Sequence, residues 1–362
     1  MMQRQHFERP TSSKQEIPLL RKTMTVLLFV FIAIISGAVG AAVVTTLFPK
    51  VIYTNVAAPT PPTQSSDKRF VALTGEIGKH GATIIKGSRA GMPNGFINPD
   101  DFLTAAVIVT SDGWLMAPLF EREGGVAVIG SDFYAVGQIV VDHFSKATFV
   151  KINARNLDPV EFSRALPDLG QSAISYDTNA SGMQRLQHSL VSQPRYLPVR
   201  NANDFVLASN QLDEFIQLHN DAPPQSNPFY FSFAGQLIGM AASVNGETVL
   251  IPARQLKVSL EQLLKGEKVI DLGIFYVDRS LSGAGQQGIV LYHPTRRAVL
   301  PGSLAARIGL RAGDVILAIN GETINSRNSF SSLWRSKAND ETIRLTILRG
   351  VEESVLEVKL KD

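Results

Sequence analysis

The sequence predicts a mainly β protein in which about two domains follow a single apolar N-terminal helix. Its 362 residues correspond to about two domains at roughly 150 residues each. From Phe70 onward, short runs of β-branched and aromatic residues are broken by Gly, Asp, Asn and Pro, which is typical of antiparallel barrels and sandwiches. An uncharged stretch, residues 23–48, precedes them, and an apolar fraction of 44% is enough to form cores.

The overall charge and residue usage argue against several function classes. The net charge is only +3, and no basic stripe with interleaved aromatic residues is visible, so no nucleic-acid partner is expected. The chain has no cysteine, which removes disulfides, thiolate zinc sites and cysteine nucleophiles. The 6 histidines show neither H-x3-H nor H-E-x-x-H spacing, so neither a metal nor a cofactor is expected.

Residues 23–48 are the predicted transmembrane helix. About 20 apolar residues span a bilayer, so this uncharged segment is long enough to cross with some tilt. Residues 1–22 before it are polar and rich in Lys and Arg, which places them in the cytoplasm. The main domains are then expected on the other side, in the periplasm or at the cell surface.

A cleaved signal peptide is the competing interpretation of this N-terminus, because residues 36–42 are small and resemble a processing site. The apolar run continues beyond them, however, and secretory apolar regions are only about 7–15 residues long, which favours a retained anchor. Ala33, Gly37 and Ala41 recur at four-residue spacing, a pattern that allows close helix–helix contact. Residues 49–69, rich in Pro, Thr and Ser, are predicted to form a semi-extended spacer.

Between residues 70 and 269 the sequence predicts many short strands and one helix. The helix is expected at Leu256–Leu264, where leucines recur on one face. The expected strands are Ala105–Thr110, Trp114–Ala117, Val126–Ile129, Ala135–Val141, Thr148–Ile152, Ala173–Tyr176, Phe229–Phe233, Leu237–Ala242 and Thr248–Ile251.

Residues 270–362 have a signature of their own. The chain reads P-G-S-L-A-A from Pro301 and G-L-R-A-G-D-V-I-L-A-I-N-G from Gly309, and Ser303 is a candidate helix N-cap. This pattern resembles the PDZ domain at the C-terminus of HtrA proteins. Gly283–Gly288 also forms a G-x-G-x-x-G pattern, but a strand-like run follows it instead of a helix, so no nucleotide site is expected.

Resemblance to PDZ domains implies a peptide-binding site. The loop Leu272, Gly273 and Ile274 would offer backbone N–H groups to a peptide carboxylate, and the strand after it would pair with the peptide. A helix over 329–338 would line the groove, with Phe330 and Leu333 as pocket residues. The alternative is a PDZ domain that packs against its neighbour and binds no peptide.

Residues 70–269 resemble the protease domain of the HtrA/DegS family, which has the trypsin-like double β-barrel. The stretch Ala105–Leu119 shares the S-D-G-W-L core with a family motif that ends in the histidine base, and Asp142–Ile152 resembles the motif that carries the acid. Ala222–Met240 is similar to the nucleophile segment, in which Ser226 takes the position of the attacking serine.

The chain departs from the family pattern at each catalytic position. Leu119 or Phe120 stands at the base position, and Lys146 at the acid position. An oxyanion hole needs a backbone N–H at the position of Pro224, and proline has none. Asn227-Pro228 replaces two glycines, which stiffens a turn that needs unusual dihedral angles.

These departures predict a catalytically degenerate HtrA-like protein, a pseudoprotease. With the predicted membrane anchor and PDZ domain, its expected function is to hold C-terminal or extended peptide segments of extracytoplasmic proteins. The alternative is a divergent, active serine endopeptidase in envelope quality control, with Ser226 activated by Lys146, His143 or His219. A third interpretation is a structural membrane partner with a closed PDZ domain. Analogy with the family implies a homotrimer.

Overall fold

The computed structural model describes most of the chain after residue 63. The predicted cytoplasmic segment, the predicted transmembrane helix and the spacer up to residue 63 lie outside the described residues. Among the described helices, none combines the length and the hydropathy that a bilayer crossing requires. The described ranges are residues 64–87, 99–120, 124–178, 184–219, 228–267, 270–281, 286–337 and 340–360.

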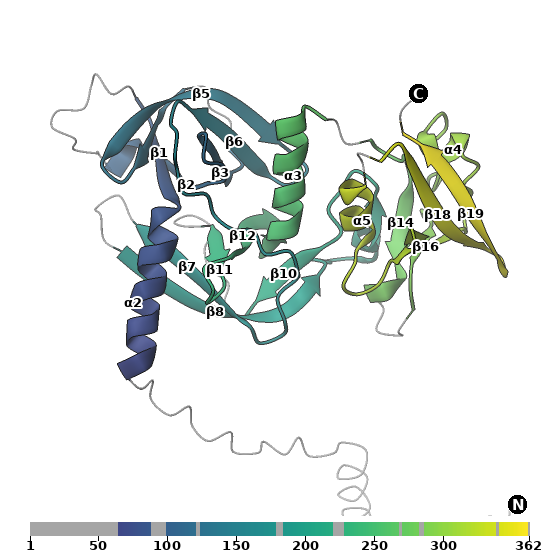
Figure 1. Cartoon of the computed structure of the whole chain (residues 1–362). Coiled ribbons are helices and arrows are strands. Elements are labelled where there is room, and N and C mark those ends of the chain that lie inside the picture. The colour runs from purple at the N-terminus through teal and green to yellow at the C-terminus, as the bar shows by residue number, and fades with distance from the viewer. Residues whose placement is uncertain are drawn as a thin grey trace, which may run out of the picture. The chain divides into compact units, whose positions relative to one another are not determined.

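The first compact element is a closed antiparallel barrel in which the strands follow the order β1-β2-β3-β6-β5-β4 (Figure 1). Alternate side chains of its strands point inward, and Ile84, Leu115 and Val150 are completely buried there. A short 3-10 helix, η3 (Pro99–Asp101), precedes β2. The strands are β1 (Gly81–Ile85), β2 (Phe102–Ile108), β3 (Trp114–Pro118), β4 (Val126–Ile129), β5 (Asp132–Asp142) and β6 (Ala147–Ile152).

The second compact element is also a closed barrel, with the strand order β10-β13-β12-β11-β7-β8. Ile216, Tyr230 and Ile238 fill its interior. Two closed antiparallel barrels in sequence confirm the double β-barrel that the sequence predicts. The strands are β7 (Ser172–Thr178), β8 (Gln184–Tyr196), β10 (Phe215–Leu218), β11 (Phe229–Phe231), β12 (Leu237–Val244) and β13 (Glu247–Pro252).

Two helices flank the barrels. Helix α2 (Gln64–Lys79) starts inside the segment 49–69 that we expected to be a spacer, because Leu73 and Ile77, one turn apart, give it an apolar face that packs into the core. Helix α3 (Ala253–Lys265) follows β13 directly and buries Leu256 and Leu260 in the same core. It ends at Gly266, whose positive φ of 67° allows the capping turn.

The third element is a sheet in the order β19-β18-β16-β15-β14-β9, with β17 paired to β16. Helices α4 (Leu304–Arg307) and α5 (Phe330–Ser336) accompany it, and their N-caps are Ser303 and Ser329, each accepting a backbone N–H. Short 3-10 helices, η4 (Ala202–Phe205) and η5 (Arg279–Leu281), precede β9 and follow β14. The strands are β9 (Val206–Ala208), β14 (Phe275–Asp278), β15 (Ile289–Leu291), β16 (Val315–Ile319), β17 (Glu322–Thr323), β18 (Thr342–Arg349) and β19 (Glu352–Lys359).

Strand β9 is unusual because it comes from the chain between two strands of the second barrel, β8 and β10, yet it pairs with β14 of the third sheet. The sequence did not predict it as a strand. It also did not predict β1, β8 or β10; β8 is rich in polar residues and contains Pro194, which hides the alternation that marks a strand.

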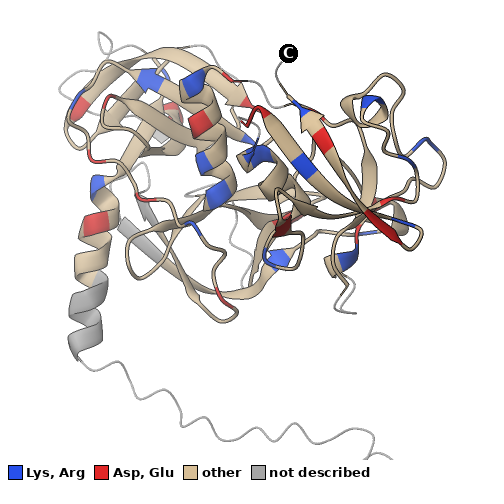
Figure 2. Ribbon diagram, turned by 45° about the vertical axis from the view of Figure 1, so that its right-hand side comes forward, with Lys and Arg blue, Asp and Glu red and all other residues tan. Residues whose placement is uncertain are grey.

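The strands that the sequence did predict agree with the structure. Each predicted strand overlaps an observed one, and Val126–Ile129 has the predicted bounds. Within the G-x-G-x-x-G pattern, Gly288 has a φ of 85° and leads into strand β15, not into a helix. Figure 2 shows basic and acidic residues interspersed over the barrels and over the third sheet.

The turn before β3 depends on a glycine. Gly113 has a φ of 105°, and a Cβ atom there would collide with the carbonyl oxygen of Ile152. Gly130 in the β4–β5 turn has a φ of 58°, but an added methyl group there would meet open space.

We therefore expect Gly113→Ala to lower the free energy of unfolding by ~3 kcal/mol or more, and Gly130→Ala by ~1 kcal/mol. Urea titration measures both, and equal losses would contradict the steric argument.

Candidate functional site

The residues at the predicted base and acid positions follow β3 and precede β6, at the ends where Pro118 pairs with Ala147. The backbone N–H of Phe120 donates to Thr148 Oγ1 at 3.1 Å, and the Thr148 hydroxyl donates back to the Phe120 carbonyl at 3.3 Å. The Phe120 ring packs against the core of the first barrel. Leu119 beside it is 43% exposed. Neither residue carries a group that could accept a proton.

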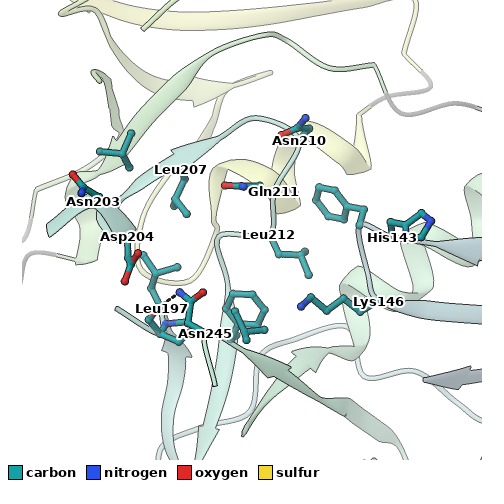
Figure 3. Close-up of a pocket in the computed structure, with 15 residues that line it drawn as sticks. His143, Lys146, Leu197, Asn203, Asp204, Leu207, Asn210, Gln211, Leu212 and Asn245 are labelled. Atoms are coloured by element: carbon teal, nitrogen blue, oxygen red, sulfur yellow. Dashed lines mark hydrogen bonds between the residues drawn. The ribbon is translucent and has the colours of Figure 1, made fainter. Parts of the chain in front are cut away.

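Lys146, at the predicted acid position, lies in the β5–β6 turn. Its φ is 52°, and its ammonium donates to the carbonyl of Ser243 at 3.1 Å. With His143 it lies at one end of a cavity of about 370 Å³, and Asn203 and Asp204 lie at the other end (Figure 3). The turn therefore presents an amine where the family resemblance would require a carboxylate.

Within the nucleophile segment Ala222–Met240, the structure describes residues 228–240 only. Ser226, Pro224 and Asn227 lie outside the described residues, so their roles stay predictions. The two histidines considered as alternative bases, His143 and His219, are both exposed.

The predicted carboxylate-binding loop precedes β14. Its backbone turns at Gly273, with a φ of 75°, and a Cβ atom there would collide with the Ser303 side chain. The N–H groups of Gly273 and Ile274 both point at one acceptor, the hydroxyl oxygen of Ser209, at 3.0 and 3.1 Å. In return, the Ser209 N–H donates to the Ile274 carbonyl at 3.0 Å. The loop thus forms an amide cradle that a hydroxyl of the same chain occupies.

A carboxylate also reaches into this cradle. Asp271 Oδ1 accepts the Ser209 hydroxyl at 2.5 Å and the Gly273 N–H at 2.9 Å. The Ser209 hydroxyl therefore donates to Asp271 while it accepts from the loop.

Strand β9, directly before Ser209, pairs antiparallel with β14. Ala208 lies opposite Phe275, Leu207 opposite Tyr276 and Val206 opposite Val277. Leu207, which the sequence did not predict as a site residue, is 6% exposed and belongs to the same buried cluster as Leu272, Ile274, Phe330 and Leu333. The structure thus brings all five predicted peptide-binding residues to one region around β9: Leu272, Gly273, Ile274, Phe330 and Leu333.

Buried polar residues after β9 hold the same region. Asp213, which is completely buried, accepts hydrogen bonds from the Tyr276 hydroxyl at 2.9 Å and from the Ser331 N–H at 3.1 Å, and it also accepts the Ser331 hydroxyl. Burial of the phenol, together with the charge of Asp213, raises the pKa of Tyr276 well above its ordinary value. Tyr276 therefore stays a neutral donor to Asp213.

Arg195 of β8 and Asp278 of β14 form a buried ion pair whose side chains are 4% and 1% exposed. Arg195 also donates to Ser280 Oγ at 2.8 Å and to the Asn325 carbonyl at 2.6 Å. Burial raises the pKa of Asp278, and the charge of Arg195 opposes this rise. A second ion pair, Arg254 with the completely buried Glu214, extends the polar network.

Arg335 of α5 inserts its side chain, 1% exposed, beside α3 and the β5–β6 turn. It donates to Gln262 Oε1 at 2.8 Å and to Ser259 Oγ at 3.1 Å, and its guanidinium lies 3.9 Å from the Phe144 ring centroid. Burial lowers the pKa of Arg335 to about 10, so the group is charged at neutral pH. Asp142 Oδ2, at 3.8 Å, supplies the facing negative charge.

One cluster with the composition of a metal site was not expected from histidine spacing. Glu76, His80 and Asp158 place one candidate ligand atom each within 4.8 Å of one another. Glu76 already pairs with the ammonium of Lys79 at 2.7 Å, and His80 Nδ1 lies 2.9 Å from the Asp158 carbonyl. Asp158 is distant from the others in sequence, which is why no local motif indicated the cluster.

Comparison with known proteins agrees with this architecture. Residues 295–349 match the family model described as PDZ domain. The serine endoprotease DegS of Haemophilus influenzae is 25% identical over 265 residues, which cover 68% of this chain and 73% of the relative. Two solved structures share the fold. The HtrA-type protease AlgW with a tripeptide has a TM-score of 0.53 and 20% identity, covering 80% of this chain and 96% of its own. The same protease with a decapeptide has a TM-score of 0.52 and 19% identity, covering 80% and 97%.

The buried Arg195–Asp278 pair gives a direct test of the polar network. Arg195→Ala leaves the Asp278 carboxylate buried without its counter-ion, and we expect a loss of about 3–5 kcal/mol in the free energy of unfolding. Arg344→Ala is the matched control, because the side chains of Arg344 and Glu357 are 69% and 58% exposed and such pairs contribute under about 1 kcal/mol. Urea denaturation measures both variants, and a loss for Arg195→Ala no larger than the control's would contradict the assignment.

Proposed function

We propose that this chain is a pseudoprotease that binds peptide segments. The chain is HtrA/DegS-like, with a trypsin-type double barrel followed by a PDZ domain. Its proposed activity is to hold extended stretches of extracytoplasmic proteins at the membrane through the PDZ domain. The observation that carries the proposal is the pair of side chains at the base and acid positions, Phe120 and Lys146.

The chemistry of serine proteases explains the weight of this observation. A serine hydroxyl is a weak nucleophile until a base removes its proton, and a further group must orient that base. The apolar ring of Phe120 packs against the barrel core, and the ammonium of Lys146 donates a hydrogen bond to a backbone carbonyl. The described part of the barrels thus offers Ser226 neither partner at these two positions.

Peptide binding is supported by the third sheet. The family model for PDZ domains matches residues 295–349 of this region. Before the matched residues, the loop at Gly273 turns two N–H groups toward a single acceptor. Domains of this class add an extended peptide to the strand that follows such a loop. In this chain that strand is β14, and the edge concerned is paired with β9. The AlgW structures contain a tripeptide or a decapeptide, which fits this mode of action.

Location and assembly are part of the proposal. We place residues 23–48 in the membrane as a single-pass anchor, residues 1–22 in the cytoplasm and the barrels on the periplasmic or cell-surface side. A homotrimer, as analogy with the family implies, would present several PDZ domains at one membrane site. Such an arrangement raises the effective concentration of sites without any new contact.

The absence of catalysis is testable on the purified full-length chain in detergent. A fluorophosphonate probe should leave Ser226 unlabelled, and unfolded casein should remain intact, because no base activates the hydroxyl. The Ser226→Ala variant, run in parallel, should behave identically. Cleavage that disappears in Ser226→Ala would instead establish the alternative function, a divergent serine endopeptidase.

Peptide binding is testable with fluorescently labelled extended peptides and the full-length chain. Gly273→Ala should weaken any saturable binding at least tenfold, since its methyl group collides with Ser303 and displaces the loop amides. Gly302→Ala is the matched control: its φ is also positive, at 72°, but no atom lies near the added methyl group. Equal affinities of both variants would show that the peptides bind elsewhere.

A further inference from the structure

We propose that the segment Val206–Ser209 is a resident ligand of the PDZ domain, and that the site accepts an internal, hydroxyl-bearing chain segment in exchange for it. The proposal that Val206–Ser209 is a resident ligand rests on the structure alone. The class of external ligand rests on the proposed function.

The first support is the position of β9 in the sheet. Strand β14 has β15 on one side, so its other side is the edge at which an extended peptide would be added. Strand β9 covers this edge in antiparallel register over three residue pairs. A peptide and β9 would need the same backbone groups of β14, so only one of them can pair there.

The second support is the apolar contact. Leu207, the middle residue of β9, is 6% exposed and clusters with Leu272, Phe330 and Leu333. Phe330 and Leu333 are the predicted pocket residues, and Leu272 belongs to the predicted carboxylate-binding loop. Leu207 therefore buries its apolar side chain in the same core as the two predicted pocket residues, Phe330 and Leu333.

The third support is the amide cradle. Ser209 places its hydroxyl oxygen at 3.0 and 3.1 Å from the N–H groups of Gly273 and Ile274. It thereby satisfies the two donors that a peptide carboxylate would otherwise accept from. The chain continues beyond Ser209 to Asn210, so the occupant is an internal segment and not a chain end.

Asp271 indicates which chemistry the cradle prefers. Its Oδ1 lies 2.5 Å from the Ser209 hydroxyl and 2.9 Å from the Gly273 N–H. A serine or threonine hydroxyl can accept from the amides and donate to Asp271 at the same time. A terminal carboxylate has no proton to donate and would face a like charge. The expected ligand is therefore an extended segment with an apolar residue two positions before an internal Ser or Thr.

Exchange is feasible because β9 can leave without opening a barrel. The closed order of the second barrel does not include β9. On either side of it, Phe205 and Asn210 are exposed. Val206 and Leu207 also line the cavity of about 370 Å³ shown in Figure 3, which leaves space beside the segment.

Hydrogen exchange on the full-length chain tests the resident segment without any peptide. Ser209→Ala and Leu207→Ser should each raise the exchange rate of the amides in 273–278 at least tenfold, because the β14 edge becomes open. Asn210→Ala, an exposed neighbour, is the control and should leave the rates unchanged. If both variants keep the wild-type rates while remaining folded by circular dichroism, the resident segment is ruled out.

Peptide titration tests the ligand class. The probe is the acetylated and amidated peptide of residues 203–212, which carries the Val-Leu-Ala-Ser sequence internally. It should bind Ser209→Ala at least tenfold more tightly than wild type, and more tightly than a peptide that ends at Ser209 in a free carboxylate. Asp271→Asn should reduce this preference between the two peptides.

The outcomes separate the two proposals. If exchange increases in the variants but neither peptide binds, the resident segment stands and the peptide-binding function falls. If the peptides bind wild type and variants equally well with unchanged exchange, the function stands and the resident segment falls. Tighter binding of the free carboxylate than of the internal segment would overturn the hydroxyl preference.

Discussion

The pairing edge of strand β14 is the constraint that governs both the candidate peptide site and its link to the barrels. A strand has two edges, and each backbone N–H and carbonyl on them can pair with one neighbouring strand only. Strand β15 uses one edge, and β9 uses the other. Because β9 belongs to the chain of the second barrel, this pairing ties the third sheet to the barrel that supplies the strand. The hydrogen bonds between β9 and β14 thus both block access to the peptide site and join the third sheet to the second barrel.

The polar network around β9 makes this arrangement specific. Asp213, Glu214 and Asp278 are carboxylates with little or no exposure, and a buried charge is costly unless its partner is in place. Tyr276 and Ser331 satisfy Asp213, and Arg195 satisfies Asp278. An apolar contact tolerates sliding, whereas these pairs require one register. We interpret the network as the reason that β9 meets β14 in a single alignment.

The barrels have the double-barrel frame of a trypsin-like protease, and their predicted base and acid positions carry Phe120 and Lys146. Strands β3 and β6 still bring Phe120 beside the start of β6, as a base and an acid would need. The frame depends on strand pairing and apolar packing, which do not require a histidine or an aspartate. Folding and catalysis draw on different residues, so the frame does not depend on which side chains stand at positions 120 and 146.

The β class, the PDZ pattern and the position of most strands could be predicted from the sequence, because alternating apolar residues and turn glycines are local signals. The sequence also shows that residue 120 is a phenylalanine, which no fold can turn into a base. What covers the β14 edge, in contrast, emerged only from the folded chain. Ser209 and Gly273 are 64 residues apart in the sequence. The short segment Val206–Ser209 has no sequence pattern that predicts pairing with β14. The closed second barrel and the buried ion pairs bring β9 next to β14, and this tertiary arrangement determines which segment pairs with that edge.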